Sequence, residues 1–85
     1  MTVVNHLGLH ARAAGQLAKL AGQFESRLVV KRSDGTAEAD ACSMLDILTL
    51  GASIGTVLII RAEGGDEAAA IAAVKQLFES GFGEI

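Results

Sequence analysis

Residues 8–12 place a histidine and an arginine two positions apart, directly after a glycine. The imidazole of His10 is a nucleophile while it is neutral. An unperturbed histidine has a pKa of about 6.5, so much of it is neutral at cytoplasmic pH. The guanidinium of Arg12 can direct two N–H donors onto phosphate oxygens. The pair therefore indicates attack of a histidine nitrogen on a phosphoryl group, with an arginine that neutralises the developing charge.

The surrounding pattern predicts a helix that begins at about Ala11 and places His10 beside its N-terminus. Unpaired N–H groups and a partial positive charge make such a terminus an anion site. The β-branched segment 2–5 predicts a strand before the site, and Gly8 permits a tight turn between them. Apolar residues at helical spacing form the buried face of the helix: Leu17, Leu20, Ala21 and Phe24.

The middle of the chain predicts a hairpin and a short helix. Residues 27–32 predict a strand, residues 33–36 a turn with Asp-Gly at its centre, and residues 36–40 a returning edge strand. Ser43 can cap a helix through its hydroxyl group. Gly51 limits the length of that helix.

Residues 56–62 (TVLIIRA) predict the strongest strand of the chain. Asp66 can cap the last helix, which ends at Gly81 and Gly83. The predicted buried stripe of that helix consists of Ile71, Val74, Leu77 and Phe78.

The order β-α-β-β-α-β-α predicts a two-layer α+β fold, an open-faced sandwich with a four-stranded antiparallel sheet and three helices on one face. A length of 85 residues predicts one domain over residues 1–85. Such a small domain leaves little room for an enclosed substrate pocket. We therefore expect chemistry near the surface, in a carrier with no cofactor rather than in a self-sufficient enzyme.

Composition argues against several classes of protein. The net charge is -3, there is no basic run, and the three Phe are the only aromatic residues, so we do not expect nucleic-acid binding. The single Cys42 allows no intrachain disulfide and suits a reducing cytoplasm. No apolar run approaches 18 residues and the N-terminus lacks the pattern of a signal peptide, so we expect no membrane insertion and a cytoplasmic location.

Each candidate residue also has a simpler interpretation. His10 could be a structural cap of the helix. His6 and His10 could suggest a metal pair, but Gly8 lies between them and no Asp, Glu or Cys is close in sequence, so we expect no metal site. Ser43 could be an N-cap or a phosphorylation site. Met44 and Leu48 could form either a partner-binding patch or part of the core.

Three segments together resemble one family. Residues 5–12 (NHLGLHAR) resemble the active-site segment of HPr, the histidine phosphocarrier family of the bacterial phosphotransferase system. Residues 42–50 (CSMLDILTL) resemble the regulatory serine segment of that family, and residues 79–84 (ESGFGE) resemble its usual ending. The resemblance covers nearly the whole chain, and the predicted order of elements suits the HPr fold.

The resemblance implies a function in sugar uptake. His10 would accept a phosphoryl group from enzyme I, ultimately from phosphoenolpyruvate, and pass it to an enzyme IIA-type protein. Arg12 would contact the phosphate, and Lys19, Met44 and Leu48 would lie on the partner-binding face. Ser43 would be the candidate for regulatory phosphorylation by an HPr kinase/phosphorylase.

Two departures from the family pattern bear on these expectations. Ala13 stands where many members have Pro, and we expect a small change in loop order with retained His10 chemistry. Near Ser43, Cys42 stands where a basic residue is frequent and Asp46 where Gly is frequent. A phosphate on Ser43 would therefore meet like charge.

Two alternatives to the sugar-type carrier remain open. A nitrogen-type regulatory paralogue would use the same surface as a phosphorylation-dependent protein-binding module. A small α+β ligand-binding domain would use His10 only as a structural cap. We expect a monomer, because partners must reach His10 from open solvent.

Overall fold

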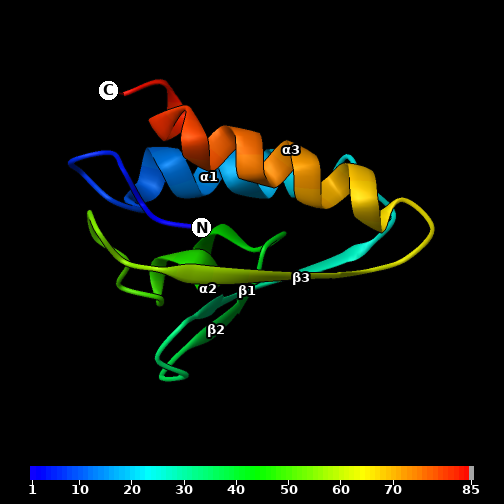
Figure 1. Ribbon diagram of the computed structural model, residues 1–85, viewed down its shortest axis with the longest axis horizontal. Helices are drawn as coiled ribbons and strands as arrows, with labels where there is room; N and C mark the ends of the chain where they lie inside the picture. Colours follow the sequence, from blue (N-terminus) through cyan, green and yellow to red (C-terminus); the bar gives the residue numbers. More distant parts are fainter. Residues whose placement is uncertain (85) are drawn as a thin grey trace.

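The computed structural model describes residues 1–84 (Figure 1), so residue 85 of the predicted domain lies outside the described residues. The fold is α+β, and within residues 1–84 three α-helices accompany three antiparallel strands. The elements in chain order are α1 (Ala11–Ala21), β1 (Arg27–Arg32), β2 (Glu38–Asp40), α2 (Met44–Leu48), β3 (Leu58–Glu63), α3 (Glu67–Glu79) and a 3-10 turn η1 (Gly81–Gly83).

The sheet has the strand order β2-β1-β3, with β1 in the centre and antiparallel to both neighbours. The strand predicted at 27–32 is confirmed in both bounds, whereas β2 is shorter than predicted and β3 is shifted toward its C-terminal end. Leu28 and Val30 are buried on one face and lie opposite Ala62 and Ile60 of β3. This alternation places one face of the sheet in the core.

The strand predicted at 2–5 is not confirmed as a regular strand. Within the described residues, Thr2 forms a single isolated bridge with Val57, and the N–H of Val3 donates to Thr56 O at 2.9 Å. The partner segment turns at Gly55, whose φ is +88° and whose N–H donates to Val3 O. Met1 and Leu58 also exchange two backbone hydrogen bonds, so the N-terminal segment lies along the start of β3. The regular sheet of residues 1–84 nevertheless has three strands, where four were predicted.

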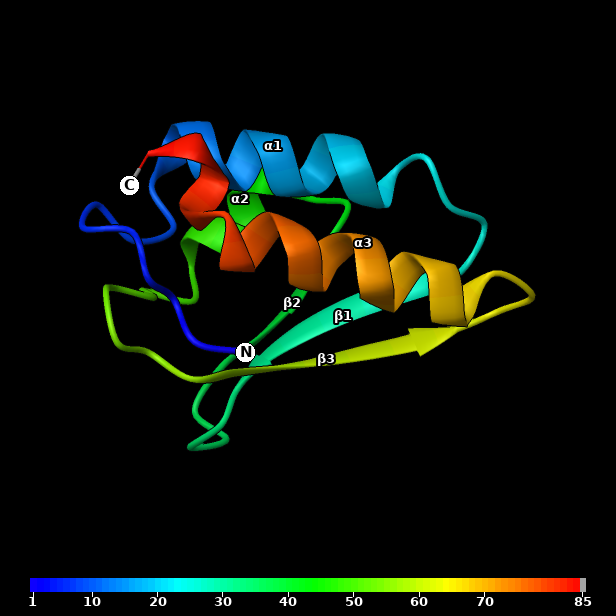
Figure 2. The ribbon, with the colours of Figure 1, turned by 45° about the horizontal axis from the view of Figure 1, so that its top comes forward.

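Figures 1 and 2 show α1 and α3 side by side over one face of the sheet. The shorter α2 packs against α1 and β2. The largest fully buried side chains come from every layer: Phe78, Leu17, Leu28, Ile47, Leu58, Val3, Val30, Val74 and Asn5. Asn5 is the only polar member of this group in residues 1–84, and it lies in the segment that leads to His10.

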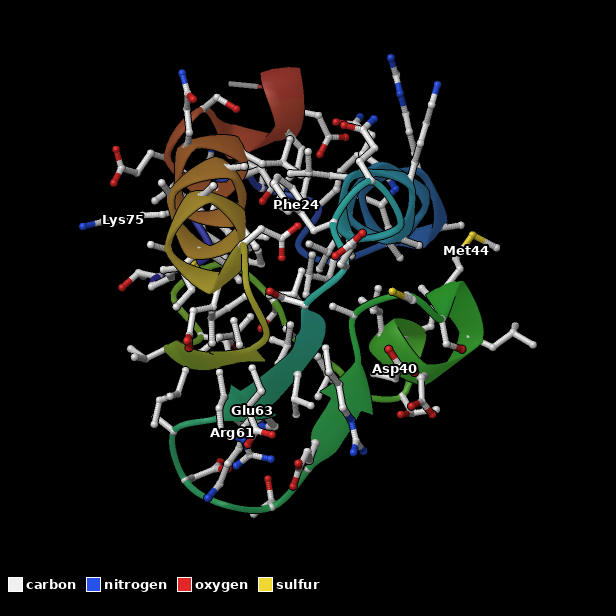
Figure 3. The ribbon with its side chains drawn as sticks, turned by 90° about the vertical axis from the view of Figure 1, so that its right-hand side faces the viewer. Phe24, Asp40, Met44, Arg61, Glu63 and Lys75 are labelled. Carbon is white, nitrogen blue, oxygen red and sulfur yellow. The ribbon has the colours of Figure 1, made fainter. Side chains whose placement is uncertain are left out.

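The buried faces of the two long helices differ in part from the prediction. In α3, Val74 and Phe78 are buried as predicted, but Ile71 is 37% exposed and Leu77 is half-buried. The row that faces the sheet has a spacing of four residues and begins at Ala70. Figure 3 shows Phe24 beside α1 and α3; this residue lies beyond the end of α1 and is half-buried.

The Asp66 side chain does not cap α3, contrary to the prediction. Its carboxylate instead accepts hydrogen bonds from the N–H of Glu25 at 2.8 Å, the N–H of Ser26 at 2.9 Å and the hydroxyl of Ser26. The Ser26 hydroxyl, and then the Glu25 N–H, hold the pKa of the Asp66 carboxyl below its ordinary value of 3.8. Asp66 thus ties the start of α3 to the loop between α1 and β1.

No helix within residues 1–84 is long and apolar enough to cross a membrane.

We predict that Asp66→Asn lowers the melting temperature at neutral pH. A carboxyl whose pKa is lowered by folding stabilises the protein above its unfolded pKa, and that contribution is lost as the pH falls through the folded pKa. The deficit of the variant should therefore shrink in acid. Thermal unfolding followed by circular dichroism at neutral and acidic pH measures it. Glu25→Gln, the same change at an exposed neighbour, is the control, and a deficit independent of pH would contradict the prediction.

Candidate functional site

His10 is the N-cap residue of α1, as the sequence predicts. Its backbone is extended, with φ -81° and ψ -179°, and its Nδ1 accepts a hydrogen bond from the backbone N–H of Arg12 at 3.3 Å. A ring nitrogen therefore replaces the hydroxyl or carboxylate oxygen of the usual cap. The lone pair of Nδ1 points at the positive end of α1.

Gly8 fixes the entry of the chain into this cap. Its φ is +66°, and a Cβ built at Gly8 would lie 2.5 Å from Ala52 O and 2.8 Å from Ser53 Cα. The next residue, Leu9, is buried and donates its N–H to Ala52 O at 2.9 Å. The loop before His10 is thus pressed against segment 52–53, and a glycine is required at the point of contact.

The second ring nitrogen of His10 contacts a residue from the other end of the chain. Nε2 lies 2.6 Å from Oε2 of Glu84, and the two side chains are 28% and 14% exposed. A carboxylate can only accept, and the backbone N–H of Arg12 can only donate. The two partners therefore require a proton on Nε2 and a lone pair on Nδ1 of a neutral His10.

Glu84 is held from its other side by Asn5. The Asn5 Nδ2 donates to Oε1 of Glu84 at 2.7 Å and to Gly8 O at 2.8 Å. The contacts of Glu84 with His10 and Asn5 could not be predicted from local sequence patterns, because Glu84 lies 74 and 79 positions from them. The available signals were a polar Asn in a β-branched segment and the family-like ending that contains Glu84.

A left-handed turn presents Glu84 to the histidine. Gly81, Phe82 and Gly83 have φ values of 62°, 57° and 75°. Phe82 is buried, its ring packs edge-on against Phe78 with centroids 4.9 Å apart, and its carbonyl accepts from Gln16 Nε2. In Figure 2 this segment lies over the first turn of α1.

Arg12 and Lys19 are exposed on α1. Within residues 1–84, the guanidinium of Arg12 forms no hydrogen bond or ion pair, so it is available to an anion at His10. His6 is exposed, whereas His10 is partly buried. No group of three or more side chains suited to hold a metal ion lies in the described part of the chain.

The α2 residues flank α1. Met44 is 41% exposed, and its sulfur lies 3.6 Å from the position a Cβ would take on Gly15 (Figure 3). Leu48 is half-buried and packs against the core. Leu45, which the sequence did not indicate as a site residue, is 73% exposed. Met44 and Leu45 thus form an exposed apolar patch on α2.

Ser43 caps α2, with its Oγ accepting from the N–H of Asp46 at 3.2 Å. The carboxylate of Asp46 accepts in turn from the N–H of Asp40. Cys42 is exposed, and desolvation together with the Asp40 carboxylate raises the pKa of its thiol.

The site is thus a partly exposed histidine at the N-terminus of a helix in an open α+β sandwich. A family model described as the PTS HPr component phosphorylation site matches residues 1–80. The chain belongs to this HPr family of phosphotransferase-system phosphocarriers.

Relatives support the assignment over nearly the whole chain. The phosphocarrier protein HPr of Cupriavidus necator is 41% identical over 98% of this chain and 91% of its own length. The phosphocarrier protein NPr of Escherichia coli K12 is 39% identical over 96% of this chain and 90% of its own. The crystal structure of HPr from Thermoanaerobacter tengcongensis has a TM-score of 0.92 at 39% identity and covers all of this chain and 93% of that one.

We predict that Gly8→Ala destabilises the fold more than Gly51→Ala. Both glycines have a positive φ, +66° and +60°, so alanine should cost about 1–2 kcal/mol of backbone strain at either position. Only the alanine at residue 8 also collides with backbone, at Ala52 and Ser53. Urea unfolding of the two variants measures the difference. Equal losses would contradict the close approach at Gly8.

Proposed function

We propose that this protein carries a phosphoryl group on Nδ1 of His10. The observation that supports it most directly is that one ring nitrogen of His10 faces a hydrogen-bond donor and the other faces an acceptor. The Arg12 N–H faces a lone pair on Nδ1, and Glu84 occupies Nε2. Nδ1 is therefore the nitrogen that can attack without first losing a proton.

In the transfer step, the lone pair of Nδ1 forms the N–P bond. The bond between phosphorus and the donor atom breaks, and its electron pair leaves with the donor. No proton moves at Nδ1. The ring gains positive charge, and the carboxylate of Glu84 at Nε2 stabilises that charge. The reverse sequence hands the phosphoryl group to an acceptor.

The first turn of α1 stabilises the phosphoryl oxygens. Once Nδ1 is bonded to phosphorus, the N–H of Arg12 is released from it and can donate to a phosphate oxygen. The other unpaired N–H groups of the first turn point the same way. The free guanidinium of Arg12 can add two donors, so positioning and electrostatics supply the catalysis.

We infer that enzyme I, itself charged from phosphoenolpyruvate, is the donor and that an enzyme IIA-type protein of sugar uptake is the acceptor. Both partners would dock on Lys19, Met44 and Leu48, joined by the exposed Leu45. An apolar patch next to a charged site suits brief docking. We place this exchange in the cytoplasm, with the carrier as a monomer.

A nitrogen-type regulatory function is the second candidate. The relatives named HPr and those named NPr match this chain at similar identity, 41% and 39% in the two cases above. In that case the same His10 chemistry would control docking of a regulatory partner. Failure to support sugar uptake, with intact His10 phosphorylation, would favour this candidate.

Regulatory phosphorylation of Ser43 by an HPr kinase/phosphorylase stays a prediction. Its hydroxyl is the cap of α2 and lies in a segment that holds the carboxylates of Asp46 and Asp40. A phosphate on Ser43 would meet both negative charges, so we expect slow modification.

We predict that enzyme I, Mg²⁺ and phosphoenolpyruvate add one phosphate to this protein, and that this phosphate is stable in alkali and lost in acid. Intact-mass spectrometry at mildly alkaline pH measures it. His10→Ala should abolish the addition while the protein remains folded, because only two side-chain hydrogen bonds are lost, one to the Arg12 N–H and one to Glu84. His6→Ala is the matched control and should be phosphorylated normally. Phosphate on His10→Ala, or none on the unaltered protein with active enzyme I, would overturn the proposal.

A further inference from the structure

Asn5 is a fully buried polar side chain whose amide nitrogen and amide oxygen differ in their hydrogen bonding. Both partners of its Nδ2, Gly8 O and Oε1 of Glu84, are acceptors. The orientation of the amide is therefore fixed by its surroundings. In that orientation Oδ1 is buried and has no hydrogen-bond partner within residues 1–84. An unpaired buried acceptor lowers stability, so stability alone does not account for Asn5.

Glu84 is a side chain that hydrogen-bonds to both Asn5 and His10. Its two carboxylate oxygens are divided between them, with Oε1 on Asn5 and Oε2 on His10. An unrestrained glutamate side chain has several rotamers of similar energy, and a partner on each oxygen selects one of them. Asn5 supplies the second partner.

The backbone that carries Glu84 is itself constrained. Phe82 has a φ of 57°, a region that costs free energy for a side chain with a Cβ. Burial of its ring against Phe78, and the bond from Gln16 to its carbonyl, hold it there. The turn therefore brings Glu84 to the histidine, and Asn5 sets the last rotation of the carboxylate.

We propose that Asn5 is a positioning residue for His10 that acts through Glu84. By holding Glu84, it keeps the proton of His10 on Nε2 hydrogen-bonded and leaves the lone pair on Nδ1. We call this chain of hydrogen bonds, from Asn5 through Glu84 to His10, the relay. Its importance for phosphoryl transfer rests on the proposed function. The relay itself is a property of the unphosphorylated protein.

A purely local function for Asn5 predicts something different. Asn5 also closes the turn before the site, since its carbonyl accepts from the N–H of Gly8 at 3.1 Å and its Nδ2 donates to Gly8 O. If that were its whole function, removing Asn5 would lower stability and leave the contact between His10 and Glu84 in place.

The test is nitrogen-15 NMR of the protein labelled at histidine, recorded at alkaline pH. We expect the proton on Nε2 of His10 to give a resonance protected from exchange with water. Exchange should accelerate roughly tenfold or more in Glu84→Ala, because a charge-assisted hydrogen bond is lost. Asn5→Ala should accelerate it in the same direction. Glu79→Ala, which removes a carboxylate from the exposed face of α3, should change nothing.

The double variant Asn5→Ala with Glu84→Ala distinguishes relay from local support. If Asn5 acts through Glu84, the double variant exchanges no faster than Glu84→Ala alone. Additive effects, or no effect of Asn5→Ala, would overturn the relay. Should Asn5→Ala fail to fold by circular dichroism, Asn5→Ser takes its place, because serine keeps a hydroxyl at the turn and is too short to reach Glu84.

Phosphorylation provides the second readout. With enzyme I and phosphoenolpyruvate, Asn5→Ala and Glu84→Ala should slow transfer to a similar extent, and the double variant should be no slower than Glu84→Ala. Faster exchange in the variants with unchanged transfer rates would overturn the importance of the relay for transfer. If the unaltered protein accepts no phosphate while the exchange effects appear, the proposed function fails and the relay stands.

Discussion

The site depends on two hydrogen bonds of opposite direction to the imidazole ring of His10, one to each nitrogen. A backbone N–H from the first turn of α1 donates to Nδ1, and a carboxylate from the last residues of the structure faces Nε2. Each contact alone is of modest strength, but together they allow only one neutral tautomer of the ring. The nitrogen that carries the lone pair is also the one nearest the helix N-terminus. In the proposed function, the nucleophilic nitrogen and the anion site therefore coincide.

The fold makes these two hydrogen bonds possible because it brings three distant segments together. The N-terminal segment supplies Asn5, α1 supplies the cap, and the turn after α3 supplies Glu84. The close approach of Gly8 to Ala52 fixes the position of the loop before His10, and the buried Phe82 fixes the turn that carries Glu84. The partly exposed ring then lies beside the exposed Arg12, where another protein can reach it.

The local features of this architecture follow from the sequence, and the distant contacts do not. The cap at His10, the strand at 27–32, the Ser43 cap and the order of the elements after residue 10 each depend on patterns within a few residues. Asp66 has the residue type of a helix cap, yet its carboxylate bonds across the domain to Ser26. The contact between Glu84 and His10 likewise depends on a turn of three residues with positive φ. One of these is Phe82, a residue that rarely adopts that conformation. Such a turn forms only because the finished core holds it.

The most direct test of this account is phosphorus and nitrogen NMR of the phosphorylated protein labelled at histidine, kept at alkaline pH. The two ring nitrogens give separate signals, so the measurement identifies the atom bonded to phosphorus. The account predicts a phosphoryl group on Nδ1 of His10, with Nε2 free of phosphorus and still within reach of Glu84. A phosphoryl group on Nε2, or on a residue other than His10, would contradict it.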